Sequence, residues 1–149
     1  MRLSPAAELA IRGTIVLAEQ YGEGPVNLDS ICARRNLPKQ YLVKLFASLT
    51  RAGLISPVRG KHGGYLLMRE PRQINVLEII EAVEGPIILN YCLHDPPQCD
   101  QDGCPMHEVW AQLQETIREK LGSMTLAHCV SRDGMPPARD RAARAGREP

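Results

Sequence analysis

Aromatic residues are scarce in this sequence, which limits both its core and its chemistry. Only one Phe, one Trp and four Tyr occur among 149 residues, although 44% of the residues are hydrophobic. The core must therefore consist mainly of aliphatic side chains. An aromatic-lined catalytic pocket is not expected, and we predict that the protein is not an enzyme.

Long apolar runs are also absent. No stretch of about 18 apolar residues, the length needed to span a membrane, occurs in the chain. Near the N-terminus, Glu8, Arg12 and Glu19 interrupt what would have to be the apolar core of a signal peptide. The sequence therefore predicts a cytoplasmic protein without a membrane partner.

Five cysteines are present, and three of them cluster. Structural disulfides are rare in the reducing cytosol, so clustered cysteines there are better explained as metal ligands or redox-active thiols. Cys92, Cys99 and Cys104 form the cluster, whereas Cys32 and Cys129 stand apart. We expect Cys32 to be a core residue, and Cys129 has no activating neighbour in the sequence.

The net charge of +1 conceals a strong segregation of charge along the chain. Residues 1–75 hold eleven Lys and Arg against five Asp and Glu, whereas residues 76–130 hold two against nine. The remaining tail holds five against three. A basic first half indicates a polyanionic partner such as nucleic acid.

The first half predicts three helices in succession. A Ser-Pro start and a Gly stop predict a helix over 4–21, and a short helix capped by Asn27 or Asp29 follows and ends near residue 36. A third helix is predicted over 38–53. Its apolar residues recur at spacings of three and four: Tyr41, Leu42, Leu45, Phe46 and Leu49. The second and third helices, joined by a tight turn, form a helix-turn-helix.

A different pattern follows the third helix. Two short apolar runs, 54–59 and 65–68, are separated by the glycine-rich segment 60–64, which predicts a β-hairpin. A hairpin directly after a helix-turn-helix is a wing. We therefore predict a mainly α-helical protein with a small β-hairpin wing, a winged helix-turn-helix.

The second half begins with a helix and then loses periodicity. Asn75 and Glu78 stand at capping-box spacing before an apolar segment that Gly85 closes, and this helix should pack on the first one. Helical period returns at Cys104 and Pro105. The long helix that follows carries an apolar stripe made of Met106, Val109, Trp110, Leu113, Ile117, Leu121 and Met124. Such a stripe needs a partner helix, so we predict a homodimer.

These patterns divide the chain into four parts. We assign 1–85 to a winged helix-turn-helix DNA-binding domain, 86–104 to a cysteine-bearing loop that needs something to order it, and 105–130 to a dimerisation helix with a C-terminal segment. The tail, 131–149, is rich in Arg, Ala, Pro and Gly, and we predict that it is disordered.

Double-stranded DNA is the partner that the helix-turn-helix and wing predict. The candidate contacts are Lys39, Gln40, Lys44, Ser48 and Arg51 on the third helix, and Arg59, Lys61 and His62 at the wing. The plain alternative is a solvated helix face and a polar loop. A nucleotide-binding role for the wing glycines is disfavoured, because no Walker-type Lys and Ser follow them on a helix.

The clustered cysteines have the spacing Cys92-x6-Cys99-x4-Cys104-x2-His107. Thiolates suit iron-sulfur clusters or zinc, the helix dipole at Cys104 favours the thiolate form, and His107 is within reach as a fourth ligand. Zinc in a Cys3His site is an open alternative, although the tight Cys-x2-Cys spacing common in zinc sites is missing. The other open alternative is that the cysteines form a metal-free thiol switch or have no role.

Several segments together resemble one known family. They are the opening MRLS, the stretch YLVKLFASLTRAGLISPVRGKHGGYLL over 41–67, the stretch INVLEIIEAVEG over 74–85, and the three spaced cysteines. Over about residues 1–130 the chain is similar to the bacterial iron-sulfur winged-helix transcription regulators, the family of IscR, NsrR and RirA. The resemblance implies a homodimer in which the long helix crosses its mate, with the cluster near the dimer interface.

The resemblance also implies ligands. Cys92, Cys99 and Cys104 match the cluster cysteines of the family, and His107 matches the fourth ligand of IscR-like members, which hold a 2Fe-2S cluster. Glu8 falls where NsrR-like members have a carboxylate ligand to a 4Fe-4S cluster, and it would come from the partner subunit. The first cysteine gap is longer than in IscR and the second is shorter. We favour Cys3His, because the segment 104–110 looks IscR-like.

The sequence thus predicts a homodimeric DNA-binding regulator that senses iron, redox state or nitric oxide through an iron-sulfur cluster. Ordering of the cysteine loop would set the spacing of the two recognition helices, and small changes in that spacing alter DNA affinity. One alternative is a small iron-sulfur electron-transfer protein, which leaves the basic wing unexplained. Another is a zinc- or thiol-stabilised winged-helix regulator without a cluster.

Overall fold

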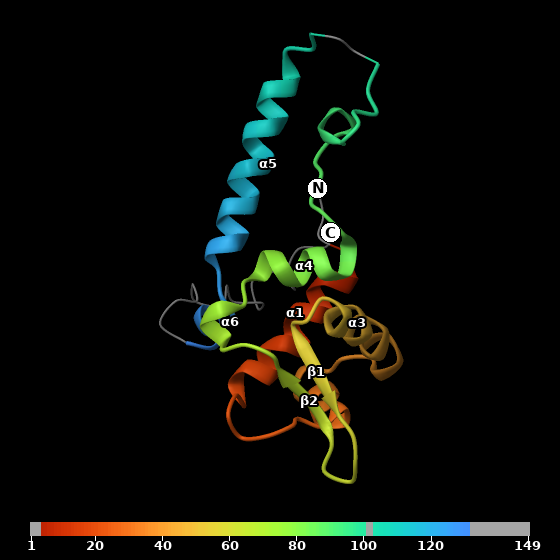
Figure 1. Cartoon of the computed structure of the whole chain (residues 1–149), viewed down its shortest axis with the longest axis vertical. Helices are drawn as coiled ribbons and strands as arrows, with labels where there is room; N and C mark the ends of the chain where they lie inside the picture. The colour runs from red at the N-terminus through yellow and green to blue at the C-terminus, as the bar shows by residue number, and fades with distance from the viewer. Residues whose placement is uncertain (1–3, 101–102, 132–149) are drawn as a thin grey trace, which may run out of the picture.

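The computed structural model describes residues 4–100 and 103–131, which form two parts (Figure 1). The lower part, here called the body, consists of residues 4–85 and 124–131. It contains α1 (Pro5–Glu19), α2 (Leu28–Arg35), α3 (Lys39–Arg51), β1 (Ile55–Val58), β2 (Gly64–Leu67), the 3-10 helix η1 (Pro71–Gln73), α4 (Val76–Glu84) and α6 (Leu126–Val130). The upper part, the arm, consists of residues 86–100 and 103–123 and contains the 3-10 helix η2 (Tyr91–Leu93) and α5 (Met106–Ser123).

The capping residues set the helix starts in the body. The Ser4 side chain accepts a hydrogen bond from the Ala7 amide, and Pro5 is the first helical residue of α1. Asn27, and not Asp29, caps α2. The predicted capping box of α4 is confirmed, since the amides and side chains of Asn75 and Glu78 bond reciprocally at 2.9 and 3.0 Å.

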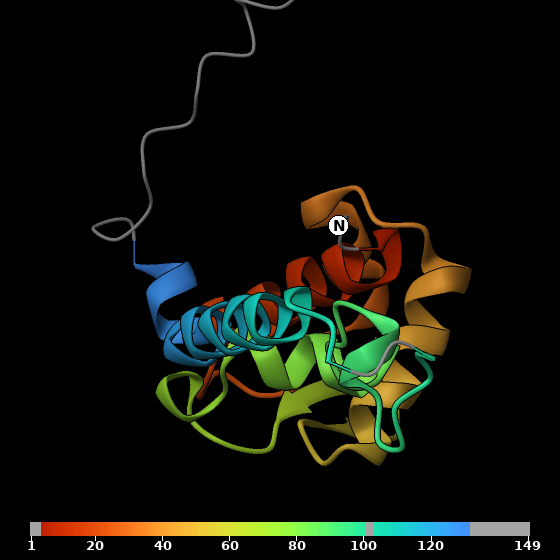
Figure 2. The same ribbon diagram turned by 90° about the horizontal axis from the view of Figure 1, so that it is seen from above.

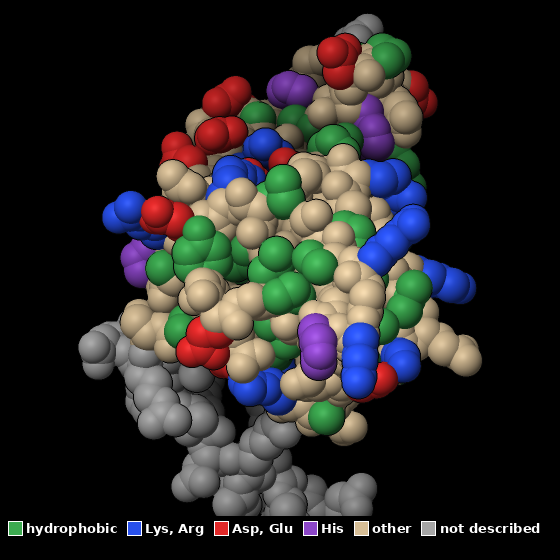
Figure 3. Space-filling view, turned by 60° about the horizontal axis from the view of Figure 1, so that its bottom comes forward, with side chains coloured by type: hydrophobic (Ala, Val, Ile, Leu, Met, Phe, Trp, Pro, Cys, Tyr) green, Lys and Arg blue, Asp and Glu red, His purple; other side chains and the backbone are tan. Residues whose placement is uncertain are grey.

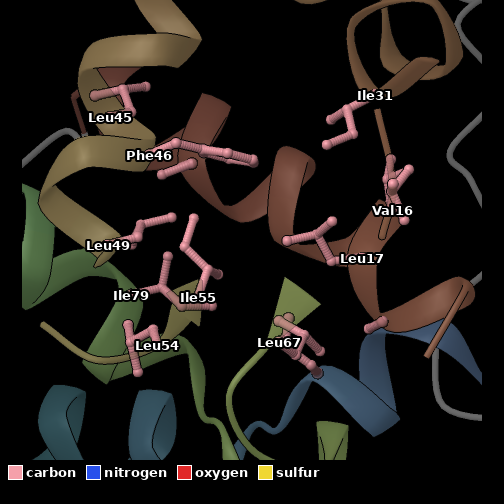
Figure 4. Close-up of a cluster of buried hydrophobic side chains, with 14 of the residues drawn as sticks. Val16, Leu17, Ile31, Leu45, Phe46, Leu49, Leu54, Ile55, Leu67 and Ile79 are labelled. Carbon is pink, nitrogen blue, oxygen red and sulfur yellow. The ribbon is translucent and has the colours of Figure 1, made fainter. Parts of the chain in front are cut away.

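An aliphatic core holds the body together (Figure 4). Phe46 of α3 is fully buried and points toward α1, where Gly13 lets the two helices approach closely. A Cβ added at Gly13 would lie 2.8 Å from the Phe46 ring, so a larger residue there must push the helices apart. The Phe46 ring also meets Tyr65 edge to face, with centroids 4.9 Å apart, which joins the wing to the core.

The predicted wing is an antiparallel hairpin in which Ile55 pairs with Leu67 and Val58 with Gly64. The amide and carbonyl groups of Val26 bond those of Tyr65 at 3.0 and 2.9 Å, so a single antiparallel bridge ties the loop before α2 to β2. This pairing holds the base of the wing against the helix-turn-helix. The predicted fold class, mainly helical with a β-hairpin wing, is confirmed.

The predicted long helix is α5, which ends at Ser123, within a residue of the predicted end of the stripe at Met124. The C-terminal segment after it forms the separate short helix α6, capped by Thr125, and its Leu126 is fully buried in the core of the body. Backbone hydrogen bonds of 2.8 and 2.9 Å pair residues 74–76 with residues 124–126 and turn the chain back. The C-terminal segment is therefore packed into the winged helix. The predicted contact of α4 with α1 is also present.

The arm rises away from the body and has no buried residue among those that the structure describes. Segment 86–93 runs beside α5, and the chain returns to the top of α5 through the cysteine segment (Figures 1 and 2). The upper part of the apolar stripe of α5 has no partner among the described residues, since Met106, Val109 and Leu113 are each more than 40% exposed, whereas Leu121 at its lower end packs on the small core around Val76 and Ile80. No helix in the described ranges is long and apolar enough to cross a membrane. Most of the predicted disordered tail, 132–149, lies outside the described residues.

Candidate nucleic-acid interface and metal centre

The solvent face of α3 carries the predicted DNA contacts. Gln40, Lys44 and Arg51 are exposed and lie along one helical face, and Arg51 donates a 3.0 Å hydrogen bond to the half-buried Ser48. Lys39 is also exposed, but its ammonium lies 2.6 Å from the carboxylate of Asp29 on α2. This hydrogen bond and the charge of Asp29 hold the pKa of Lys39 above its ordinary value. Gln40, Lys44 and Arg51 are thus the side chains best placed to reach outward.

The same face contains apolar residues that the sequence reasoning missed. Tyr41, predicted with the core residues, is 39% exposed, and Val43 is 43% exposed. Ala47 is exposed between Lys44 and Arg51. Apolar side chains on such a face are suited to contacts with thymine methyl groups. A helical wheel would have placed Val43 and Ala47 on the polar side, so the signal was present in the spacing.

The wing tip carries the remaining predicted DNA contacts. Arg59, Lys61 and His62 are all exposed at the turn between β1 and β2. Gly63 is required there, because an added Cβ would lie 2.2 Å from the Val58 carbonyl oxygen. Lys and Arg side chains gather over the lower and right-hand parts of the face in Figure 3, whereas most Asp and Glu lie above them. The body thus presents a basic surface formed by α3 and the wing.

The cysteine segment closes around a cavity at the far end of the arm. Cys92, Cys99, Cys104 and His107 all line this cavity of about 400 Å³, together with Pro97, Gly103, Pro105 and Glu108. Cys99 is exposed and the other two thiols are half-buried. All three cysteines are free of disulfide bonds. The spacing in the sequence therefore brings four potential ligands to one place.

Local hydrogen bonds position these side chains. The Asn90 side chain accepts from the Tyr91 amide at 2.8 Å and caps η2, which carries Cys92. The carbonyl oxygen of Tyr91 accepts from the Gln98 amide at 3.0 Å and folds the chain back toward Cys99. At the start of α5 the His107 amide donates to the Cys104 carbonyl at 3.1 Å, so these two potential ligands share one helical turn.

The donor set has the chemistry of a metal site, since thiolates and imidazole are common metal ligands. Among the described residues, no three Cys, His, Asp or Glu side chains are grouped closely enough to hold one metal ion. A zinc ion needs all its ligands within about 2.0–2.3 Å of one point. Thiolates together with an imidazole suit an iron-sulfur cluster as well as zinc. The residues present are thus compatible with a cluster.

The other candidate ligands lie elsewhere. Glu8 is on α1, its side chain is 59% exposed and paired with Arg12, and it does not line the cavity of its own chain. Burial, followed by the charge of Asp29, raises the pKa of the Cys32 thiol, and burial raises the pKa of Cys129. Cys32 packs partly against the main core, as predicted. Neither of these two thiols is favoured as a thiolate ligand.

Comparison with known proteins gives a family. Residues 3–132 match the family profile described as Rrf2, iron-dependent transcriptional regulator. The chain is 36% identical to the HTH-type transcriptional regulator CymR of Bacillus subtilis over 88% of this chain and 91% of that protein. It is also 36% identical to the HTH-type transcriptional regulator IscR of Xenorhabdus nematophila, over 95% of this chain and 86% of that one.

Solved structures agree with the sequence matches. The structure of CymR, described as the global cysteine regulator of B. subtilis, has a TM-score of 0.76 at 34% identity and covers 87% of this chain and 96% of its own. The structure of T. potens IscR has a TM-score of 0.74 at 35% identity and covers 93% and 94%. The similarity therefore includes both the body and the arm.

Proposed function

The chain belongs to the Rrf2 family of transcriptional regulators, as its sequence predicted, and from this premise we propose that it is a homodimeric DNA-binding regulator controlled by an iron-sulfur cluster. The cluster would be held by Cys92, Cys99, Cys104 and His107. One observation carries the proposal: a single cavity gathers these four donors at the end of the arm, while α3 and the wing present a basic surface on the body.

The proposed DNA contacts divide by type. Gln40, Lys44 and Arg51 would reach base edges and phosphates in the major groove, with Lys39 and Ser48 at the margins of the same face. Arg59, Lys61 and His62 would approach the minor groove or the backbone from the wing. Support comes from the exposure of these side chains and from the order of helix-turn-helix and hairpin.

Dimerisation would cover the exposed stripe of α5. Met106, Val109 and Leu113 leave an apolar surface on a helix of 18 residues with no buried residue. A second copy of the same helix is the partner that the stripe predicts. Because each α5 connects directly to α6 in the body, pairing of the two arms would also set the separation of the two copies of α3.

When bound, the cluster would supply a redox-sensitive and iron-dependent link between the cysteine segment and α5. The chain's own residues prepare this link. Cys104 lies just before the start of α5, and η2 carries Cys92, which lines the same cavity. Three thiols and one imidazole favour a 2Fe-2S cluster, whereas a 4Fe-4S cluster would call on Glu8 of the partner subunit.

The decisive experiment begins with anaerobic purification. We expect a visible absorption spectrum together with stoichiometric iron and acid-labile sulfide. Loaded and unloaded dimers should then differ about 5- to 150-fold in affinity for the same operator at one salt concentration, the usual range for coupling between two sites. Equal affinities would contradict cluster control, and absence of iron and sulfide would contradict the cluster itself.

The fourth ligand is tested by two variants. His107→Ala should shift the spectrum or make the cluster labile if the imidazole is a ligand, and Glu8→Ala should then leave the spectrum unchanged. The opposite result would assign the carboxylate of the partner subunit and favour a 4Fe-4S cluster. Paired spectra at equal protein concentration give the answer.

A second candidate is a regulator that uses the same cysteines as thiols, or with zinc, without an iron-sulfur cluster. One observation favours it: a relative of similar identity is described as a cysteine regulator. Because the described donors are not grouped around one point, the metal-free form of this candidate is favoured over the zinc form. Colourless protein that holds about one zinc, or metal-free protein whose DNA affinity changes on thiol oxidation, would support this candidate.

A further inference from the structure

One ion pair joins the arm to the body. The carboxylate of Glu81 on α4 accepts a hydrogen bond from Arg118 on α5. The same carboxylate oxygen accepts a longer hydrogen bond of 3.4 Å from the Ile87 amide, at the start of the cysteine-bearing segment. A single side chain of the body therefore contacts both segments of the arm: the segment that starts at Ile87 and the helix α5.

A second contact lies one helical turn further up α5. The Leu89 amide donates to the Gln114 side chain at 2.9 Å. Gln114 and Arg118 are four residues apart, so they lie on the same face of α5. This face holds segment 87–89 along its length, and Ile87 also packs on the small core around Val76 and Ile80.

The Glu81–Arg118 pair differs from the other ion pairs of the described residues. The other five lie wholly within the body, whereas this one crosses to the arm. It is also the most sheltered, with side chains 32% and 27% exposed. Shelter from water strengthens an ion pair, so this pair is better suited to holding a fixed geometry than a fully exposed one.

The partners of α4 give this contact its meaning. Helix α4 touches α5 on one side and α1 and α3 on others, so it lies between the arm and the helix that carries the proposed DNA contacts. Because Glu81 of α4 binds Arg118 of α5, a change in the angle of α5 should also move α4. Packed helices shift as units and do not deform continuously, because their side chains interlock.

We infer that Glu81 is a positioning residue: with Arg118 and the Ile87 amide, it fixes the arm to the body, so that ordering of the cysteine segment is transmitted to α3. The inference rests on the proposed function. Loss of the ion pair should leave the DNA-binding surface and the cluster donors intact and should weaken the connection between them.

The test compares Arg118→Met with Arg69→Met. Methionine keeps the aliphatic stem and removes the charge in both variants. Arg69 donates a 2.7 Å hydrogen bond to Glu78, which lies on α4 as Glu81 does, and this pair has an exposure similar to that of the Glu81–Arg118 pair. Because Arg69 contacts only the body, it is the matched control. Glu81→Gln, which keeps the shape of the side chain, serves as a second disruption of the same contact.

Two measurements are made on each variant. In unloaded dimer, hydrogen exchange of the amides in 87–89 should become about two- to fivefold faster in Arg118→Met and Glu81→Gln, the loss expected of a partly sheltered pair. The ratio of DNA affinities between loaded and unloaded dimer, about 5- to 150-fold in wild type, should fall to about twofold or less. Arg69→Met should keep both wild-type values.

The outcomes separate the inference from the proposed function. A wild-type ratio retained in Arg118→Met, or lost equally in Arg69→Met, would overturn the positioning role. A ratio of one in wild-type protein would overturn cluster control, and hydrogen exchange in the unloaded dimer would then decide the positioning role alone: unchanged exchange of 87–89 in both disrupted variants would overturn it.

Discussion

The body and the arm differ in how many hydrophobic residues they bury. Every buried hydrophobic residue in the described ranges lies in the body, where α1, α3 and α4 enclose Phe46 and its neighbours. The arm contains the longest helix, of 18 residues, and none of its residues is buried. The part that would read DNA therefore has a hydrophobic core of its own, whereas the described part that bears the cysteines has none.

This difference shows where sensitivity to a signal can reside. Most helical stability in proteins comes from tertiary packing of an apolar face, and the upper part of α5 buries little apolar surface. The arm needs a partner helix along its stripe and an ordering agent at its tip. Either event would change the arm while leaving the core of the body intact.

The largest expected effect is loss of the chromophore when a cysteine at the tip of the arm is removed. Cys92→Ala, Cys99→Ala and Cys104→Ala should each abolish the visible absorption of anaerobically purified protein, because each removes one proposed ligand from the cavity at the tip of the arm. Absorption spectra with iron assays measure the loss. Cys129→Ala, which removes a thiol packed against the body, is the control.

That control should retain full colour and a normal iron content. If one of the three cluster variants kept its colour, the corresponding cysteine could not be a ligand. If Cys129→Ala became colourless, the site would have to be sought at the junction of body and arm, and the division between a reading part and a sensing part would fail.

The second effect concerns the stripe on α5. Leu113→Glu should weaken the dimer by roughly 100-fold or more, because burial of a leucine contributes about 1.5–3 kcal/mol and the change occurs in both copies. Sedimentation equilibrium over a range of concentrations measures it. Met68→Glu alters a residue that is even more exposed, 56% against 46%, but lies in the body, and it should leave the dimer intact.

Much of the body could be predicted from local signals. Ser4, Asn75 and Gly85 mark helix ends because capping is a property of a few neighbouring residues. The end of α5 was predicted to within a residue, since the stripe was assigned through Met124 and the helix ends at Ser123. The position of the segment after α5 could not be predicted in this way, because only the pairing of residues 124–126 with 74–76 brings it back to the body.

In the candidate site, too, contacts between residues close in the sequence could be predicted and contacts between distant residues could not. Close spacing predicted that Cys92, Cys99, Cys104 and His107 lie near one another, and they line one cavity, whereas their role as ligands stays a prediction. The contact between Glu81 and Arg118 joins residues 37 apart in the sequence, and each looks like an ordinary charge on a helix surface. Long-range polar contacts leave no periodic pattern and become visible only when the helices are placed.

A smaller effect is expected at the wing. Lys61→Ala should weaken binding to all DNA sequences alike and should lower the slope of log affinity against log salt by about two per dimer, one for each lost phosphate contact. Lys120→Ala removes an exposed charge from the arm and should leave the slope unchanged. An unaltered slope in Lys61→Ala, measured by titration at several salt concentrations, would remove the wing from the interface.

The smallest effect distinguishes the thiols of the two parts by their chemistry. Burial raises the pKa of Cys129, and burial with the charge of Asp29 raises that of Cys32, so both thiols stay protonated in the folded protein above the ordinary thiol pKa of 9.0. Their contribution to stability is therefore complete below pH 9.0 and is lost as the pH rises through the folded-state values.

In unloaded protein at pH 8, alkylation followed by mass spectrometry should modify Cys99, the exposed thiol, before Cys32 and Cys129. Modification of Cys129 as fast as Cys99 would show that the junction of body and arm opens readily, and the contrast between a closed body and an open arm would be lost.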